Sequence, residues 1–216
     1  MKKHGIKASR IFDGIWSNFL SFFLAVIWLI PIVWVLAASF REGSGFLSTT
    51  FFPKTFTLEN YINLFKVTAG IKFVNWVKNT LIIAVTNTVL TTFFTIITAY
   101  TLSRFRFKAR KGLMNIALIL GMFPGFMAMV AVYLILNLLG LIGNIWALLL
   151  VYVSGAGLGF FVSKGYFDTI SKEIDEAAIL DGANQFTIFF KVFLPLSKPI
   201  IIYTALMAFM TPLTDY

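Results

Sequence analysis

Four long stretches of this sequence contain no charged residue. Asp, Glu, Lys and Arg are all absent from residues 14–40, 79–103, 112–163 and 199–214. A charge near the centre of a bilayer costs about 3 kcal/mol, and one helical crossing needs about 20 apolar residues. Since 59% of the chain is hydrophobic and only 12% is charged, its composition is that of a membrane protein. We therefore predict an all-α integral membrane protein.

The third uncharged stretch is long enough for two crossings. We predict five spans in a polytopic helical bundle, near residues 18–39, 76–101, 113–138, 145–163 and 198–216. Residues 1–17 then form an N-terminal tail, and residues 18–216 form the transmembrane domain. A cleavable signal peptide is the alternative for the first span. The apolar core of a signal peptide is about 7 to 15 residues long, whereas the uncharged stretch here has 27 residues, so an uncleaved span is favoured.

Basic residues flank the predicted spans on one side. Four precede the first span and five fill the short loop after the second: Lys2, Lys3, Lys7, Arg10, Arg104, Arg106, Lys108, Arg110 and Lys111. Such residues mark the cytoplasmic side, so we expect the N-terminus and residues 164–197 in the cytoplasm and residues 40–75 outside. The net charge of +9 also raises nucleic acid as a partner. Because the basic loop lies between two spans, we interpret it as a topology determinant that meets anionic membrane lipid, with no nucleic acid bound.

Several kinds of chemistry lack the residues they need. The chain has no cysteine and one histidine, His4, so we expect no metal site. No GxxxxGK[ST] sequence occurs, so the chain should not hydrolyse ATP itself. An intramembrane enzyme is a competing hypothesis, but the uncharged stretches 79–103 and 112–163 hold no ionisable Asp, Glu, Lys, Arg or His to act as a base. We expect no catalytic residue and no cofactor bound by this chain.

Residues 176–199 are the one polar passage in the second half of the chain. In the loop 164–197, which holds most of this passage, we predict two short helices with a corner between them. Ser171 caps the first helix, and the acidic residues of its first turn suit the positive end of the helix dipole. Gly182 supplies a left-handed corner. The second helix begins near Asn184 and must end before Pro195, since proline lacks an amide hydrogen and disfavours helix in the residue before it.

Four phenylalanines are spaced along the second of these helices. Phe186, Phe189, Phe190 and Phe193 fall at positions i, i+3, i+4 and i+7, which predicts a single aromatic stripe on one face. The stripe either packs against the ends of the chain's own spans or rests in the lipid interface, or it is presented to a groove in another protein.

One pattern in this passage matches a known family. Glu176-Ala177-Ala178 is followed by Gly182, Val192 and Leu194-Pro195, which resembles the EAA loop in permease subunits of bacterial ABC importers. The stretches NTLIIAVTNTVL, AYTLSRFRFKARKG and FFVSKGYFDTISKEIDEAAILDGA resemble successive blocks of the carbohydrate-uptake branch, specifically the smaller permease typified by the maltose system. The ending FMTPLTDY is similar to the maltodextrin members.

This resemblance implies a fold, a function and partners. The fold is that of a type I ABC importer permease, which normally has six spans, so a chain with five would lack the last helix. The function is one half of an ATP-driven carbohydrate importer in the bacterial cytoplasmic membrane, for maltose, maltodextrin or a related oligosaccharide; another small solute is the alternative. The partners are a second permease subunit, a dimer of ATP-binding subunits that holds ATP and Mg, and an extracytoplasmic sugar-binding protein.

The resemblance also implies which residues couple the permease to its ATPase. We refer to residues 164–197 as the EAA loop, whose helix is expected to insert into a cleft on the ATPase. The small alanines would let that helix seat closely, and the glutamate would pair with a basic group. The residues assigned to coupling are Glu176, Ala177, Ala178, Asp181, Gly182, Phe186, Phe189, Leu194 and Pro195.

Polar residues within the spans mark a candidate substrate path. Asn79, Asn87 and Thr91 are tolerated in a span where they face a cavity or a neighbouring helix. Pro124, together with Gly121 and Gly125, is predicted to break the third span and expose backbone groups. Sugars are uncharged, so a carbohydrate path needs no buried ion.

Overall fold

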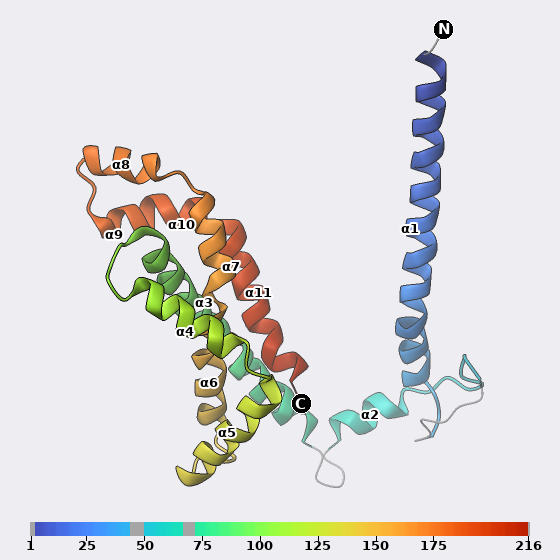
Figure 1. Cartoon of the computed structure of the whole chain (residues 1–216). Helices are drawn as coiled ribbons and strands as arrows, with labels where there is room; N and C mark the ends of the chain where they lie inside the picture. The colour runs from blue at the N-terminus through green and yellow to red at the C-terminus, as the bar shows by residue number, and fades with distance from the viewer. Residues whose placement is uncertain (1–2, 44–49, 67–71, 216) are drawn as a thin grey trace. The chain divides into compact units, whose positions relative to one another are not determined.

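The computed structural model describes residues 3–43, 50–66 and 72–215, so Lys2 and Tyr216 lie outside the described residues. Within those ranges the regular elements are helices, and the one β feature is an isolated antiparallel bridge between Arg41 and Phe56 (Figure 1). The predicted all-α class is confirmed. The chain forms two compact units, Met1–Val74 and Asn75–Tyr216.

The first unit contains α1 (Lys3–Ser39) and α2 (Glu59–Phe65). Within α1, Gly14–Ser39 is 26 residues long and apolar enough to cross a membrane. Its large apolar side chains are exposed, Trp28 by 77%, as suits a helix that contacts lipid. The Asn60 side chain of α2 donates to the carbonyls of Ser39 and Arg41, at 3.1 and 2.7 Å, and so fixes α2 to the end of α1.

The second unit begins near the start of α3 (Phe73–Arg104), which is 32 residues long. Shorter helices follow it in order: α4 (Arg110–Gly121), α5 (Gly125–Leu138), α6 (Ile145–Ser154), α7 (Ala156–Thr169), α8 (Lys172–Leu180), α9 (Gln185–Thr187), the π-helix η1 (Ile188–Phe193), α10 (Leu194–Leu196) and α11 (Lys198–Thr214). In Figure 1, α8 lies at one end of this unit, next to the segment α9–α10.

Membrane crossings are formed by long helices and by bent pairs. Among the described residues, α1 and α3 are each long and apolar enough to cross alone. Ile145–Ser154 with Gly159–Thr169, bent by 42°, and Gln185–Leu196 with Lys198–Thr214, bent by 80°, would each add one span. The multi-pass character is therefore confirmed, whereas the number of five spans stays a prediction.

The predicted third span is interrupted, as expected, at Pro124. Helix α4 ends at Gly121 and α5 begins at Gly125, with Pro124 in an extended conformation at φ −57° and ψ 124°. Proline lacks the N–H that would continue the hydrogen-bond ladder and clashes with the preceding turn. The break therefore follows directly from the sequence.

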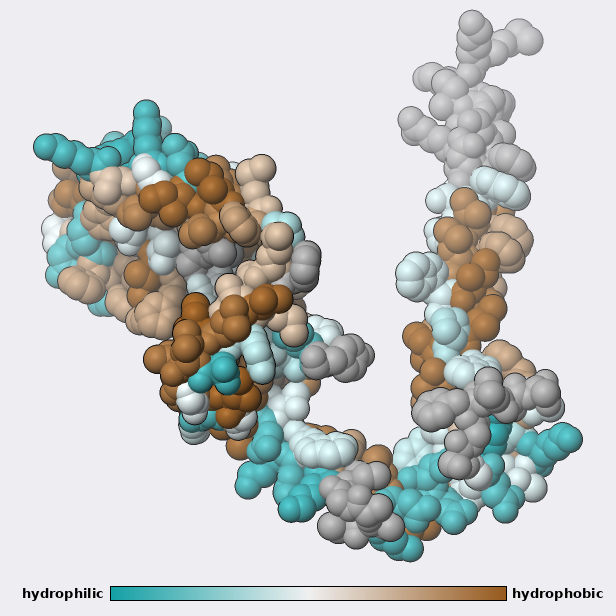
Figure 2. Space-filling view, turned by 60° about the horizontal axis from the view of Figure 1, so that its bottom comes forward, coloured by the Kyte–Doolittle hydropathy of each residue, from teal (hydrophilic) through white to brown (hydrophobic). Residues whose placement is uncertain are grey.

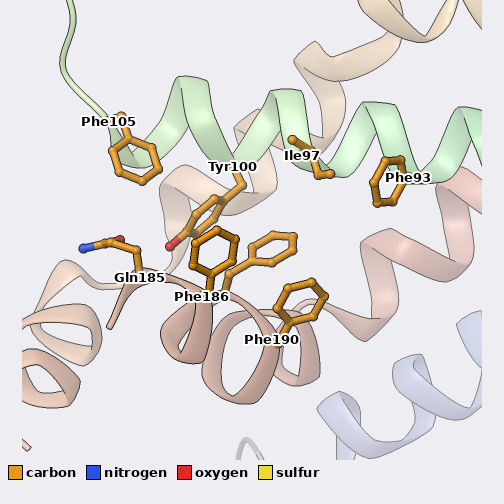
Figure 3. A pocket seen from close by; sticks show the side chains of 8 residues that line it. Phe93, Ile97, Tyr100, Phe105, Gln185, Phe186 and Phe190 are labelled. Atoms are coloured by element: carbon orange, nitrogen blue, oxygen red, sulfur yellow. The ribbon is translucent and has the colours of Figure 1, made fainter. Parts of the chain in front are cut away.

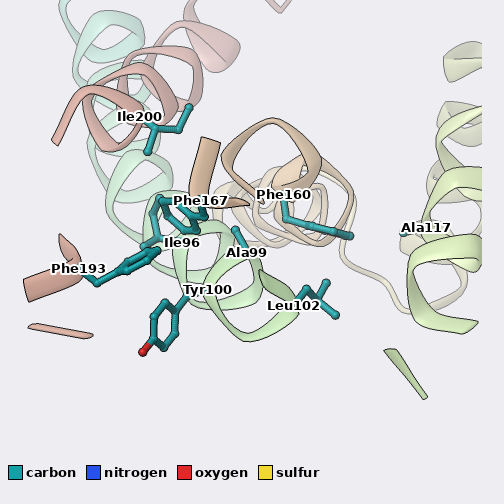
Figure 4. Close-up of a cluster of buried hydrophobic side chains, with 9 residues drawn as sticks. All are labelled: Ile96, Ala99, Tyr100, Leu102, Ala117, Phe160, Phe167, Phe193 and Ile200. Carbon is teal, nitrogen blue, oxygen red and sulfur yellow. The ribbon is translucent and has the colours of Figure 1, made fainter. Parts of the chain in front are cut away.

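A cluster of buried apolar side chains forms the core at the Arg104 end of α3 (Figure 4). Ala99 has no exposed surface, which lets neighbouring helices approach α3 closely. The Phe193 ring packs edge-on against Tyr100 and Phe167, with centroids 4.7 and 4.8 Å apart. The cluster consists of Ile96, Ala99, Tyr100, Leu102, Ala117, Phe160, Phe167, Phe193 and Ile200. It joins α3, α4, α7, η1 and α11 and so fixes the base of the EAA loop.

Hydrophobic side chains also cover much of the surface (Figure 2). Leu138 and Met122, for example, are 85% and 83% exposed. In water such surface would drive association. Around a helix in a bilayer it is the expected exterior, because lipid tails are as apolar as leucine.

Candidate functional site

The first helix of the EAA loop is capped as predicted. The Ser171 side chain accepts a hydrogen bond from the Glu173 N–H at 3.3 Å, and Glu173 and Asp175 lie in the first turn of α8. No residue of α8 is buried. The helix therefore holds its shape through its caps and dipole rather than through burial of an apolar face.

The predicted corner at Gly182 is confirmed. Gly182 has φ +84°, its N–H donates to the Ile179 carbonyl at 2.9 Å, and the Ala183 N–H donates to the Ala178 carbonyl at 2.9 Å. This pair of bonds is the Schellman arrangement, which satisfies two carbonyls at the end of α8. The glycine thus sets the direction in which the chain leaves α8.

The second helix begins where predicted but ends later. The Asn184 side chain accepts from the Thr187 N–H at 2.8 Å. The helix then continues through Pro195 to Leu196, so the prediction that it ends before Pro195 is wrong. The turn before the proline is a π-helix, in which the Leu194 N–H donates to the Phe189 carbonyl. This wider turn avoids the usual clash between a proline ring and the carbonyl four residues earlier.

The four phenylalanines lie on the side of their segment that faces α3, but they differ in burial. Phe193 is 1% exposed and Phe189 is half-buried, its ring centroid 4.7 Å from that of Tyr100. Phe186 and Phe190 are 77% and 57% exposed.

The two exposed phenylalanines line an apolar groove between α3 and the α9–η1 segment (Figure 3). Its volume is about 480 Å³. In Figure 3 Phe186 and Phe190 face Tyr100 and Ile97 of α3 across the groove. The lining residues are Phe93, Ile97, Tyr100, Phe105, Gln185, Phe186, Phe189 and Phe190.

The remaining residues assigned to coupling differ in their surroundings. Ala178 is half-buried. The exposed residues are Glu176, Ala177, Asp181, Gly182 and Pro195. Leu194 is half-buried and packs against the core cluster. The exposed α8 is thus available to another molecule, whereas Leu194 and Phe189 hold the loop to its own chain.

The last residues of α3 contact the EAA loop through polar bonds. The Ser103 hydroxyl donates to Asp168 Oδ1 at 2.6 Å, and Arg104 Nε lies 2.7 Å from Asp175 Oδ2. Burial raises the pKa of the Asp175 carboxyl, although the Arg104 charge lowers it. The sequence placed Arg104 among five topology-determining cations, but its side chain is only 6% exposed.

A second cavity lies between α3, α6, α7 and α11 and is lined by hydroxyl and amide groups. Its volume is about 390 Å³, and no charged side chain is among the described residues that line it. Two predicted path residues, Asn87 and Thr91, lie in this lining. The sequence offered a signal for further lining residues, namely polar residues within apolar spans, but the prediction did not include those of the other helices. These are Tyr152, Ser163, Tyr203, Thr204 and Thr211.

Asn87 connects two helices at the wall of this cavity. Its Nδ2 donates to the Ala208 carbonyl at 2.7 Å, and its Oδ1 accepts from the Thr91 hydroxyl at 2.8 Å. Ala208 lies four residues before Pro212 within α11, and proline has no N–H to give to that carbonyl. The buried amide, 2% exposed, therefore supplies the donor that α11 lacks.

The other two predicted path residues lie elsewhere. Asn79 lines a separate cavity of about 410 Å³ together with Tyr133 and Asn144. Pro124 is not among the described residues that line this cavity or the one at Asn87. The structure therefore brings together two of the four predicted path residues. Among the described residues no cluster of three or more His, Cys, Asp and Glu side chains could hold a metal ion.

Known proteins resemble this chain in sequence and fold. Residues 91–216 match the family described as "Binding-protein-dependent transport system inner membrane component". The chain is 36% identical to the galactooligosaccharides transport system permease protein GanQ of Bacillus subtilis (strain 168), over 98% of this chain and 75% of the relative. It is 34% identical to the maltodextrin transport system permease protein MdxG of the same strain, over 96% and 74%.

A solved structure agrees with these relatives. It is that of a bacterial ABC transporter involved in the import of the acidic polysaccharide alginate, with a TM-score of 0.71 and 25% identity over 95% of this chain and 71% of that chain. The family match begins within α3 and includes the EAA loop. The chain therefore belongs to the family of binding-protein-dependent transport system inner membrane components.

Proposed function

We propose that this chain is the permease subunit of an ATP-driven importer of neutral oligosaccharides, with maltodextrins and galactooligosaccharides as the first candidates. The observation that carries the proposal is the cavity at Asn87, which offers hydroxyl and amide groups and no charge among its described lining residues. Sugar hydroxyls are recognised by such groups, and aromatic rings such as those of Tyr152 and Tyr203 add apolar contact to a sugar face. Relatives named for the transport of galactooligosaccharides and maltodextrin support this class.

The lining also favours neutral over acidic sugars. The structural neighbour is involved in the import of an acidic polysaccharide, which would require compensation of its carboxylates on the way through a bilayer. Neither the cavity at Asn87 nor that at Asn79 has a Lys or Arg among its described lining residues. An unpaired carboxylate in such surroundings is costly.

We assign α8 as the element that docks on a partner ATPase. Its apolar side chains Ile179 and Leu180 are 51% and 89% exposed, and the exposed Glu176 lies on the same short helix. An unburied helix with apolar and charged groups suits insertion into a groove of another protein. ATP and Mg would be bound by that partner, and the orientation with the N-terminus and the EAA loop in the cytoplasm follows from the flanking basic residues.

Uptake by cells that lack their own oligosaccharide importers tests the substrate. Cells that express the complete transporter receive labelled maltodextrin, galactooligosaccharide or an alginate oligosaccharide. We expect ATP-dependent accumulation of a neutral sugar, and a raised KM for uptake in Thr91→Val. Thr88→Val is the matched control, since Thr88 bonds its own helix at Ala84. Uptake of the acidic sugar alone, or of none of the three, would overturn the assignment.

Crosslinking tests the coupling role. The chain has no cysteine, so Ala177→Cys introduces a unique thiol on α8. In native membranes we expect it to capture an ATP-binding subunit, whereas Phe22→Cys on the exposed side of α1 should not. Absence of that adduct at Ala177 would contradict docking through α8.

A further inference from the structure

Arg104 contacts three separate parts of the EAA loop. Its NH2 group donates at 3.0 Å to the carbonyl of Ile170, the residue that follows α7. Its Nε lies 2.7 Å from Asp175 Oδ2 in α8. Its guanidinium carbon lies 4.8 Å from the centre of the Phe193 ring in η1. One side chain therefore joins the segment before α8, α8 itself and the segment after the Gly182 corner.

These contacts are shielded from water. The Arg104 side chain is 6% exposed and that of Asp175 is 17% exposed, and Phe193 belongs to the buried core. An arginine suits this position because its amino group can donate to a carbonyl while its charge pairs with a carboxylate and its planar face rests on an aromatic ring. A lysine carries the same charge but lacks the planar fork.

α8 has few other means of holding its place. It has no buried residue, and it is joined to the chain through the Ile170 turn and the Gly182 corner. Among the described residues, Arg104–Asp175 is the one ion pair that joins α8 to α3. Buried ion pairs add little net stability but can select one arrangement over others.

We propose that Arg104 is the positioning residue of the EAA loop, which holds α8 in one orientation relative to α3 so that movement of the docked helix is transmitted to the span that lines the polar cavity. The proposal rests on the proposed function for the consequence in transport. The positional part concerns this chain alone. α3 is continuous from Asn87 to Arg104, a distance of about 25 Å at 1.5 Å per residue.

Two readouts on the same membranes separate the positional part from the transport part. Spin labels at Val89→Cys in α3 and Leu180→Cys in α8, which are 63% and 89% exposed, report the distance between the two helices in a complete transporter whose other subunits lack cysteine. Sugar uptake and ATP hydrolysis are measured on matching unlabelled membranes. The variants are Arg104→Gln, Arg104→Lys and Asp175→Asn, with Arg106→Gln as the control, since Arg106 is exposed in the short loop between α3 and α4.

We expect a single narrow distance distribution in the parent and in Arg106→Gln, and a broadened one in all three test variants. ATP hydrolysed per sugar imported should rise about tenfold in Arg104→Gln, within the usual range of coupling between sites. Asp175→Asn keeps the size of the side chain, so it should insert in normal amounts if Arg104→Gln does not.

A narrow, unchanged distribution in Arg104→Gln and Asp175→Asn would overturn the proposal, whatever uptake does. Full recovery of both readouts by Arg104→Lys would also overturn it, because charge alone would then suffice. Failure of the parent transporter to import any sugar, with the broadening still seen in the variants, would instead contradict the proposed function and leave the positional role supported.

Discussion

Exchange of Asn87 for leucine tests the link between α3 and α11. The Asn87 amide donates at 2.7 Å to the Ala208 carbonyl, the group that Pro212 leaves without its helical partner. Leucine fills a similar volume but donates nothing, so the buried carbonyl loses its partner. We expect the free energy of unfolding to fall by about 1–2 kcal/mol, the usual effect of one unsatisfied polar group, which is often smaller in membrane helices.

Pro212→Ala is the second arm of this experiment. Alanine restores an N–H four residues after Ala208, so the carbonyl regains a partner within α11. In that background Asn87→Leu should cost little, and the double-mutant cycle should show a coupling of about 1 kcal/mol. Thr88→Val is the control on the same helix, because the Thr88 hydroxyl bonds the Ala84 carbonyl of its own helix, which keeps its backbone partner.

The assay is reversible unfolding in mixed micelles with increasing denaturing detergent, followed by tryptophan fluorescence. If Asn87→Leu costs the same in both backgrounds, to within about 0.3 kcal/mol, the Ala208 carbonyl does not depend on Asn87 and the reasoning is refuted. A Thr88→Val cost equal to that of Asn87→Leu would refute it as well, since polarity alone would then explain both.

Three further predictions concern the EAA loop. Gly182→Ala should cost about 1–2 kcal/mol of local stability and lower uptake, because a φ of +84° disfavours any side chain, although a Cβ there would meet no atom within 4 Å. Gly165→Ala is the control: Gly165 is helical and has equally open space around it, so uptake should be unchanged. Burial holds the pKa of Asp175 above its ordinary value despite the Arg104 and Lys172 charges, and the Glu176 charge adds to the rise. The contribution of Asp175 to the free energy of unfolding is therefore full below the ordinary Asp pKa and is lost as the pH rises through the raised value. Asp175→Asn should flatten that part of a stability–pH profile, and an unchanged profile would contradict this prediction. Phe193→Ala, at a side chain 1% exposed, should cost about 3 kcal/mol and reduce the amount of protein in membranes, whereas Phe190→Ala, 57% exposed, should leave that amount unchanged in quantitative blots.

Local signals in the sequence predicted local structure well. The cap at Ser171, the corner at Gly182, the start at Asn184 and the break at Pro124 each depend on backbone chemistry within a few residues. The end of the second EAA-loop helix was predicted wrongly from an equally local rule. The proline rule assumes a regular α-helical turn, and the π turn before Pro195 removes that assumption.

Contacts between distant residues could not be read in the same way. Asn87 was singled out as polar within a span, but its partner is 121 residues away, and nothing near Asn87 indicates that Pro212 leaves a carbonyl free. Arg104 was grouped with its basic neighbours, because the positions of charges along the sequence indicate on which side of the membrane they lie and not where each side chain points. Whether an arginine points to lipid or back into the chain depends on which acidic group the fold brings to it.

One helix carries both of these long-range contacts, and this limits how α3 can move. At the Asn87 end a buried amide ties it to α11, and at the Arg104 end a buried cation ties it to the EAA loop. Neither bond can be exchanged for water within a bilayer or a packed core without cost. A displacement of the EAA loop would therefore move α3 and α11 together more readily than it would separate them, and the wall of the cavity formed by these two helices would shift as one body.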